Sequence, residues 1–166
     1  MNPLTDQQIR SSFVNASRRE VNQAILPELA SLPWGRLDYL GWRDRKRPLV
    51  AYVVLELAGT PTGVVLRGTG PSEGPRRKAV CAWCEDVVVS DDVSLYVARR
   101  AGARGRQGDT VGTLICTEFT CSGNVRRPPT RSEVGSDDPA DREALTQRRI
   151  AGLQERSARF VSRLLQ

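Results

Sequence analysis

The chain has 166 residues, is rich in arginine and is poor in aromatic side chains, which make up only 5% of it. This length accommodates one ordinary domain, or a compact domain with an added helical segment, built around a thin apolar core. Lys and Arg together number 25, against 19 Asp and Glu, which makes the chain basic. Histidine is absent, so the commonest general base and the usual ligand of catalytic zinc are missing. We therefore expect a binding protein rather than an enzyme. Its arginines suit RNA or an acidic protein partner, although a GC-rich genome would also enrich arginine.

The sequence shows neither a membrane segment nor a secretion signal. No apolar run approaches the roughly 18 residues that span a bilayer, and Met1 to Asp6 lack the basic start and apolar stretch of a signal peptide. We expect a cytoplasmic protein with no membrane partner and no small-molecule substrate. Because cytoplasmic thiols stay reduced, four cysteines in two close pairs favour a metal site over disulfides.

Two capping boxes predict short helices near the start of the chain. In Thr5-Asp6-Gln7-Gln8 and in Ser17-Arg18-Arg19-Glu20, a hydroxyl residue is followed three positions later by Gln or Glu, which is the pattern of a capped helix start. We expect two short helices within residues 5–26. They would form an N-terminal helical segment, residues 1–30, ahead of a domain that spans residues 31–166.

Five segments rich in valine or aromatic residues are expected to be strands, because such side chains favour extended backbone. Turn residues between them, such as Gly59 to Gly63, favour antiparallel hairpins. Together with the helices they predict an α+β fold. The predicted strands are residues 37–42, 51–57, 64–67, 93–98 and 110–115.

A basic segment rich in glycine, residues 99–108, lies between the last two predicted strands. Gly102, Gly105 and Gly108 are spaced by three, but no Walker or Rossmann pattern accompanies them, so they indicate a nucleotide site only weakly. We expect a loop at the tip of a hairpin. Its arginines would contact RNA or an acidic protein, unless the segment is a solvated turn with incidental charge.

The C-terminal third is expected to be helical at both ends. Residues 117–125 favour a short helix, and residues 127–140 contain prolines, serines and acids with almost nothing apolar, which is typical of a flexible linker. From Asp141 onward, apolar residues recur at helical spacing and arginines lie opposite, which predicts a long amphipathic helix. These apolar residues are Ile150, Leu153, Phe160, Val161 and Leu164.

The four cysteines carry the most specific signal. Cys81 and Cys84 form a C-x₂-C pair, and Cys116 and Cys121 form a C-x₄-C pair 31 residues later. Four converging thiolates are the ligand set of a closed, structural Zn²⁺ site. The order of a cysteine knuckle, a hairpin, a strand and a helix predicts a treble-clef zinc finger. A redox pair, or four simple buried thiols, are the alternatives.

A catalytic interpretation would depend on carboxylates, since histidine is absent. Asp91, Asp92 and Asp109 are the candidates, and nothing in their spacing distinguishes them from solvated acids in turns.

Three phrases of the sequence resemble the elongation-factor-G-binding proteins of the fusidic-acid-resistance (FusB-type) family, in particular the actinobacterial FBP-domain proteins. The phrases are Leu40–Asp44, Val93–Gly102 and Gly105–Cys116, and the similarity extends over most of residues 12–125. The resemblance implies a C-terminal treble-clef zinc finger. It also implies binding to elongation factor G on the ribosome, which the better-known members release when fusidic acid has locked it there.

The resemblance, together with the arginines of residues 99–108, suggests which residues contact this partner. At two positions where the resistance proteins tend to carry a lysine and an aromatic residue, this chain has Gln107 and Thr110. A rival interpretation is an RNA-binding or rRNA-binding module that uses the same arginines together with Arg127. The predicted partner-binding residues are Arg99, Arg100, Arg104, Arg106, Gln107, Thr110, Phe119, Val125 and Arg126.

Overall fold

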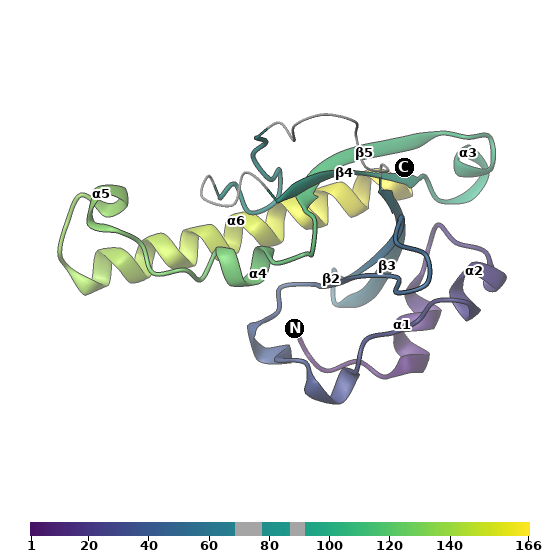
Figure 1. Cartoon of the computed structure of the whole chain (residues 1–166), viewed down its shortest axis with the longest axis horizontal. Helices are drawn as coiled ribbons and strands as arrows, with labels where there is room; N and C mark the ends of the chain where they lie inside the picture. The colour runs from purple at the N-terminus through teal and green to yellow at the C-terminus, as the bar shows by residue number, and fades with distance from the viewer. Residues whose placement is uncertain (69–77, 87–91) are drawn as a thin grey trace.

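The computed structural model describes residues 1–68, 78–86 and 92–166 (Figure 1). It is an α+β fold in which a long C-terminal helix crosses an antiparallel sheet. The helices are α1 (Asp6–Ser12), α2 (Arg18–Asn22), η1 (Leu29–Ser31), η2 (Trp34–Arg36), α3 (Gly102–Arg106), α4 (Cys121–Asn124), α5 (Arg131–Val134) and α6 (Pro139–Leu165), and the strands are β1 (Leu40–Arg43), β2 (Val50–Leu57), β3 (Thr60–Gly68), β4 (Val93–Arg99) and β5 (Thr110–Cys116).

Both predicted helix starts near the N-terminus are confirmed. The Thr5 hydroxyl accepts from the backbone N–H of Gln8, and the Ser17 hydroxyl accepts from that of Glu20. In each case the third residue returns a hydrogen bond to the cap, so two donors that a helix start leaves open are satisfied.

The sheet has five strands in the order β1-β2-β3-β4-β5, and every neighbouring pair is antiparallel. The β2–β3 hairpin turns at Ala58 and Gly59, which have φ of 49° and 77°, as a tight turn that follows the strand twist requires. By contrast, β3 and β4 pair only at Arg67 with Val97 and at Gly68 with Tyr96. The β4–β5 hairpin therefore diverges from the rest of the sheet (Figure 1).

The sheet separates two apolar clusters. On one face, α6 packs against the sheet with Leu153, Phe160 and Leu164 buried, as its helical spacing predicts. On the other face, Ile9 and Ala24 of the N-terminal segment cover Trp42, Tyr52 and Val65. Strand β2 is buried on both faces over Val50–Leu55, which explains why its sequence is an unbroken apolar run rather than an alternating one.

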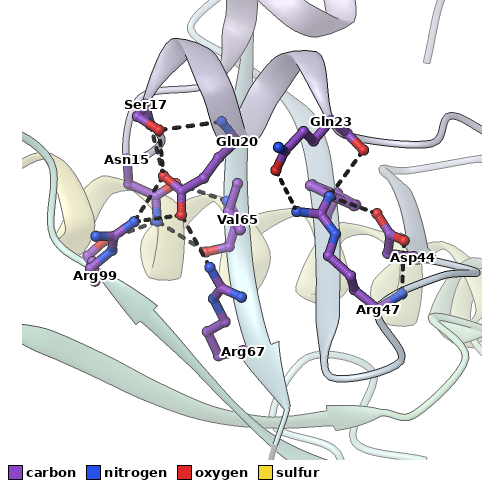
Figure 2. A network of polar contacts seen from close by, with 10 residues as sticks. Asn15, Ser17, Glu20, Gln23, Asp44, Arg47, Val65, Arg67 and Arg99 are labelled. Carbon is purple, nitrogen blue, oxygen red and sulfur yellow. Dashed lines mark hydrogen bonds and ion pairs between the residues drawn. The ribbon is translucent and has the colours of Figure 1, made fainter.

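Two polar groups fasten residues 1–30 to the sheet (Figure 2). The buried Asn15 amide bonds the backbone N–H and C=O of Val65 and the C=O of Arg99, at 2.8 to 3.0 Å. It thus fills the gap where β3 and β4 part. Glu20 receives Arg67 at 3.0 Å and Arg99 at 2.8 Å. Burial alone raises the pKa of Glu20, but hydrogen bonds from Ser17 and the charges of Arg99 and Arg67 hold it below its ordinary value.

A second group of contacts closes the turn between β1 and β2 (Figure 2). The side chain of Asp44 is completely buried and receives Arg47 at 2.9 Å and the Tyr52 hydroxyl at 3.0 Å. Burial, and then the hydrogen bond to Asp44, raise the pKa of Tyr52 to about 12. Asp44 is the last residue of Leu40–Asp44, one of the three segments that resemble the FBP-domain proteins, and its side chain stabilises this turn.

Three expectations about local structure were wrong. Residues 99–108 are not an open loop, because α3 forms within them and packs on the end of β4. Residues 127–140 are not a continuous linker, because they contain α5 and the start of α6. The helix expected over residues 117–125 is confined to Cys121–Asn124. Helix α3 is stabilised by contacts with residues that follow β4 and end α6, whereas α5 begins with a local capping box between Thr130 and Glu133.

Candidate metal centre

The four cysteines come from three parts of the fold. Cys81 and Cys84 lie in a turn that is joined to β5 by a hydrogen bond from the N–H of Ala82 to the C=O of Leu114, 2.8 Å long. Cys116 is the last residue of β5, and Cys121 is the first residue of α4. Two turns at the site require left-handed backbone, at Glu85 directly after Cys84 (φ 54°) and at Phe119 between Cys116 and Cys121 (φ 58°). Knuckle, strand and short helix are thus placed as in a treble clef.

All four thiols are buried and free, and their Sγ atoms lie within 4.8 Å of one another. The Sγ of Cys81 is 3.6 Å from that of Cys121, and the Sγ of Cys84 is 3.7 Å from that of Cys116. These separations are far longer than the roughly 2.0 Å of a disulfide. They match the edge of about 3.8 Å in a tetrahedron with Zn–S bonds near 2.3 Å. The four cysteines therefore fit one structural Zn²⁺.

The proximity of the thiols couples their ionisation. Hydrogen bonds from Cys116 and Cys121 lower the pKa of Cys81, whereas Cys121 donates to its neighbours and its pKa is raised. Hydrogen bonds from Cys116 and Cys121 lower the pKa of Cys84 as well, so two of the four thiols ionise more readily than the others, and the two thiolates repel each other. A divalent cation removes this conflict, because it neutralises the thiolates that bind it.

Neutral donors surround the sulfurs. The backbone N–H groups of Trp83 and Cys84 point to the Sγ of Cys81 at 3.4 and 3.5 Å. The side-chain amide of Asn124 donates to the Sγ of Cys116 at 3.3 Å. Such contacts orient metal-bound thiolates and stabilise their charge. Asn124 was not among the predicted site residues, although its position three residues after Cys121 places it on the same helix.

Aromatic residues and α6 enclose the centre. The rings of Tyr39 and Phe160 pack on Trp83 with centroids 5.1 and 5.6 Å away. Complete burial, and then the neighbouring Cys121, raise the pKa of Tyr39 well above its ordinary value. Arg156 of α6 donates to the C=O of Trp83 at 2.7 Å and pairs with Glu85 at 3.0 Å. The terminal helix therefore packs on the zinc finger, which the sequence alone did not decide.

Of the predicted partner-binding residues, some lie inside the protein. Phe119 and Val125 are buried, at 7% and 1% exposure, and Phe119 packs so closely on β1 that a Cβ at Gly41 would lie 2.7 Å from it. Arg126 binds Asp38 at 3.1 Å, and Arg100 pairs with Asp109 at 3.2 Å. These four are structural. The exposed members of the set are Arg99, Arg104, Arg106, Gln107 and Thr110.

The exposed residues are held in place by α3. Gly105 lies directly against β4, where a Cβ would come within 1.8 Å of the C=O of Arg100. The N–H of Ala101 donates to the C=O of Leu164 at 2.8 Å, and Asp109 pairs with Arg104 at 2.7 Å. The segment is thus anchored to both β4 and the end of α6.

The alternative partner residue and the candidate carboxylates have structural contacts. Arg127 pairs with Asp86 at 3.5 Å and with Glu133 at 3.3 Å. The backbone of Asp92 accepts from Thr117 at 2.9 Å, and Asp109 is paired as above. Asp91 lies outside the described residues.

None of the helices in the described segments has the length and apolar content that a membrane crossing requires.

Comparison with known proteins agrees with this geometry. No curated protein and no solved structure matches the chain. The family model of the FBP C-terminal treble-clef zinc-finger matches residues 8–164, nearly the whole chain and all four cysteines. The chain therefore belongs to the FBP C-terminal treble-clef zinc-finger family.

Proposed function

We propose that this protein is an adaptor that binds elongation factor G through the zinc-supported β4–β5 hairpin and promotes release of the factor from the ribosome. Membership of the FBP zinc-finger family supports the zinc-binding part of this proposal. The partner is suggested by the resemblance of the phrases Val93–Gly102 and Gly105–Cys116, which form this hairpin and α3.

The observation that carries the proposal is an uncovered apolar face on the hairpin. Leu95 and Leu114 are directly opposite each other in the β4–β5 pairing, and each is 40% exposed. The half-buried Val97 and the exposed Thr110 lie on the same face of the hairpin. Among the described residues, the N-terminal segment packs its apolar side chains on β1–β3 and bonds β4 at Arg99. A pair of exposed leucines on a rigid support suits a protein partner.

The hairpin is rigid because both of its ends are fixed. At one end, β5 runs into the cysteine cluster through Cys116, and at the other, α3 is bonded to the end of α6. A surface that needs no ordering on binding loses less conformational entropy. In this account Zn²⁺ contributes to binding by holding the hairpin, without contacting the partner.

We propose no reaction for the protein itself. Four protein thiolates complete the coordination of Zn²⁺, which leaves no position for a water molecule to be activated. The chain has no histidine to act as a base.

Co-elution with purified elongation factor G of the same organism tests the proposal. The variant Leu95→Thr/Leu114→Thr keeps β-forming residues on the strands but removes the apolar pair. We expect it to weaken binding by about 1–3 kcal/mol, with zinc content and melting temperature unchanged.

The matched control is Leu49→Thr/Leu165→Thr, because these two leucines are each 48% exposed but lie outside the hairpin. This control should bind as tightly as the wild type. The proposal is wrong if the wild type does not co-elute, or if both variants bind equally well.

A further inference from the structure

Helices α2 and α3 and the C-terminal end of α6 lie toward the same end of the molecule (Figure 1), and these elements and the strand ends beside them carry a group of arginines. We call this surface the basic end. It comprises Arg18, Arg19, Arg67, Arg99, Arg100, Arg104, Arg106 and Arg163, with the carboxylates Glu20 and Asp109. Contacts connect these residues across elements that are far apart in sequence. Glu20 joins α2 to β3 and β4, and Arg100 donates to the C=O of Arg163 in α6.

The basic end accounts for the whole charge surplus of the chain. Its eight arginines and two carboxylates leave six positive charges, which equals the net charge of +6. The 17 other cationic and 17 other acidic side chains balance each other. The other 15 of the 23 arginines lie elsewhere in the chain, so it is the excess of positive over negative charge, not the arginine content, that this surface accounts for.

Both carboxylates of the basic end are already shared. Glu20 holds Arg67 and Arg99, and Asp109 holds Arg100 and Arg104. Each carboxylate thus fixes two guanidinium groups while neutralising one charge (Figure 2 shows the first set). Arg18, Arg19 and Arg106 are exposed and have no side-chain partner among the described residues. The guanidinium groups that Glu20 and Asp109 hold are therefore already ordered before an anion binds.

A recess lies at the centre of the surface. It has a volume of about 240 Å³. Its lining includes Ala16, Ser17 and the carboxylate-bearing Glu20 from the N-terminal segment, and Arg99, Arg100, Gly102, Gly105 and Arg106 from the end of β4 and α3. Small residues on both walls let a ligand approach the backbone closely. The recess is several times the roughly 30 Å³ that a water molecule occupies in the liquid.

We propose that the basic end binds the phosphate backbone of helical RNA. Arginine matches phosphate oxygens in a bidentate manner, and contacts of this kind position a protein on a nucleic acid. Proteins that bind unpaired bases commonly stack them on aromatic side chains, in addition to guanidinium planes. All nine aromatic residues of the chain are described, and none is exposed. The surface therefore suits the backbone of a duplex rather than single-stranded bases.

The proposal does not depend on binding to elongation factor G. The Leu95–Leu114 pair and the arginines of α2 lie on different parts of the surface. Each group can therefore be substituted without changing the other. A protein docked on a ribosome-bound factor would also lie close to ribosomal RNA, and the two surfaces together would suit such a position.

The test measures the affinity of the full zinc-loaded chain for a 20-base-pair RNA duplex at several salt concentrations. Arg18→Ala/Arg19→Ala removes two arginines of α2, and Arg104→Ala/Arg106→Ala removes two of α3, one of which, Arg106, lines the recess. Each variant should lose about tenfold in affinity and lower the dependence of log K on log salt by about 2, because each phosphate contact contributes roughly 0.9 to it.

The matched control is Arg131→Ala/Arg148→Ala, which removes one exposed arginine from α5, at the opposite end of the molecule (Figure 1), and one from the first half of α6. It should keep the wild-type salt slope. Absence of RNA binding by the wild type, or an equal loss in the control, would overturn the proposal. It would also be overturned if Arg18→Ala/Arg19→Ala weakened binding to elongation factor G while leaving RNA binding unchanged, since the surface would then serve a protein.

Discussion

At the residue scale, Asn124 shows how the zinc site depends on more than its ligands. Its amide is the side-chain donor at 3.3 Å from the Sγ of Cys116, and it also bonds the Thr120 hydroxyl at 3.2 Å. The second bond fixes the direction of the first. A hydrogen bond from a neutral donor stabilises the negative charge of a metal-bound thiolate.

Asn124→Ala should therefore lower the affinity for Zn²⁺ by about 10- to 100-fold, as loss of an outer-shell donor typically does. Competition with a coloured chelator measures the change. Ser132→Ala, an exposed change on α5, serves as a control and should leave the affinity unaltered. Equal affinity of Asn124→Ala and the wild type would mean that the amide only caps α4.

Glu133 illustrates a residue whose ionisation is set by its helix. Hydrogen bonds from the backbone and the hydroxyl of Thr130, followed by Arg149, lower the pKa of Glu133 from 4.5 to about 2. Because the folded pKa is depressed, its stabilising contribution is complete above about pH 4.5. It is lost as the pH falls toward 2.

An NMR titration of the Glu133 carboxyl should therefore have a midpoint near 2. In Thr130→Ala the midpoint should rise, because the hydroxyl and the ordered cap are lost. A wild-type midpoint at or above the ordinary value would show that α5 is not formed in solution.

At the scale of elements, the sequence predicted most of those whose signals are local, although the capping box of α5 at Thr130 and Glu133 was missed. The capping boxes at Thr5 and Ser17, the five strands and the amphipathic helix all carry their pattern within a few residues. Helix α3 does not, since its sequence contains two glycines and no side-chain cap. Its order comes from tertiary contacts with Arg100 and Leu164.

The same reasoning applies to the candidate site. The cysteine spacing identified all four metal ligands, because ligand geometry is reflected directly in spacing. The partner residues stay a prediction, and the sequence did not reveal which of them are buried. Phe119 and Val125 are buried by contacts with residues far away in sequence, and the pairing of Leu95 with Leu114 depends on strand register.

Substitution of Gly105 tests whether α3 is ordered as described. A Cβ there would lie 1.8 Å from the backbone C=O of Arg100, so Gly105→Ala should displace α3 and lower stability by roughly 1–3 kcal/mol. At Gly123 of α4 a Cβ would meet no atom within 4 Å. Gly123→Ala should therefore be neutral or slightly stabilising in urea denaturation. Similar stability of both variants would show that residues 99–108 form an open loop after all.

At the scale of the whole molecule, the metal and the sheet support each other. One apolar cluster contains all four cysteines together with β2, β3 and α6. A structural Zn²⁺ typically adds about 10–16 kcal/mol of binding energy, comparable to the roughly 5–15 kcal/mol of net stability of a domain. Because the metal ligands lie inside the main core, loss of the metal should affect the entire fold.

Native mass spectrometry should find one Zn²⁺ per chain. Cys116→Ser should lose most of this metal and also lose the cooperative thermal transition, since Cys116 joins β5 to the centre. A variant that keeps both the metal and its melting transition would exclude the four-cysteine site.

The most direct test of the account is a calorimetric titration of elongation factor G with the protein in three states: zinc-loaded, stripped by a chelator, and stripped and then reloaded. We expect the loaded and reloaded forms to bind one molecule of factor with equal affinity, and the stripped form to show no binding. Undiminished binding by the stripped form, or no binding by the loaded form, would contradict the claim that a zinc-supported hairpin recognises the factor.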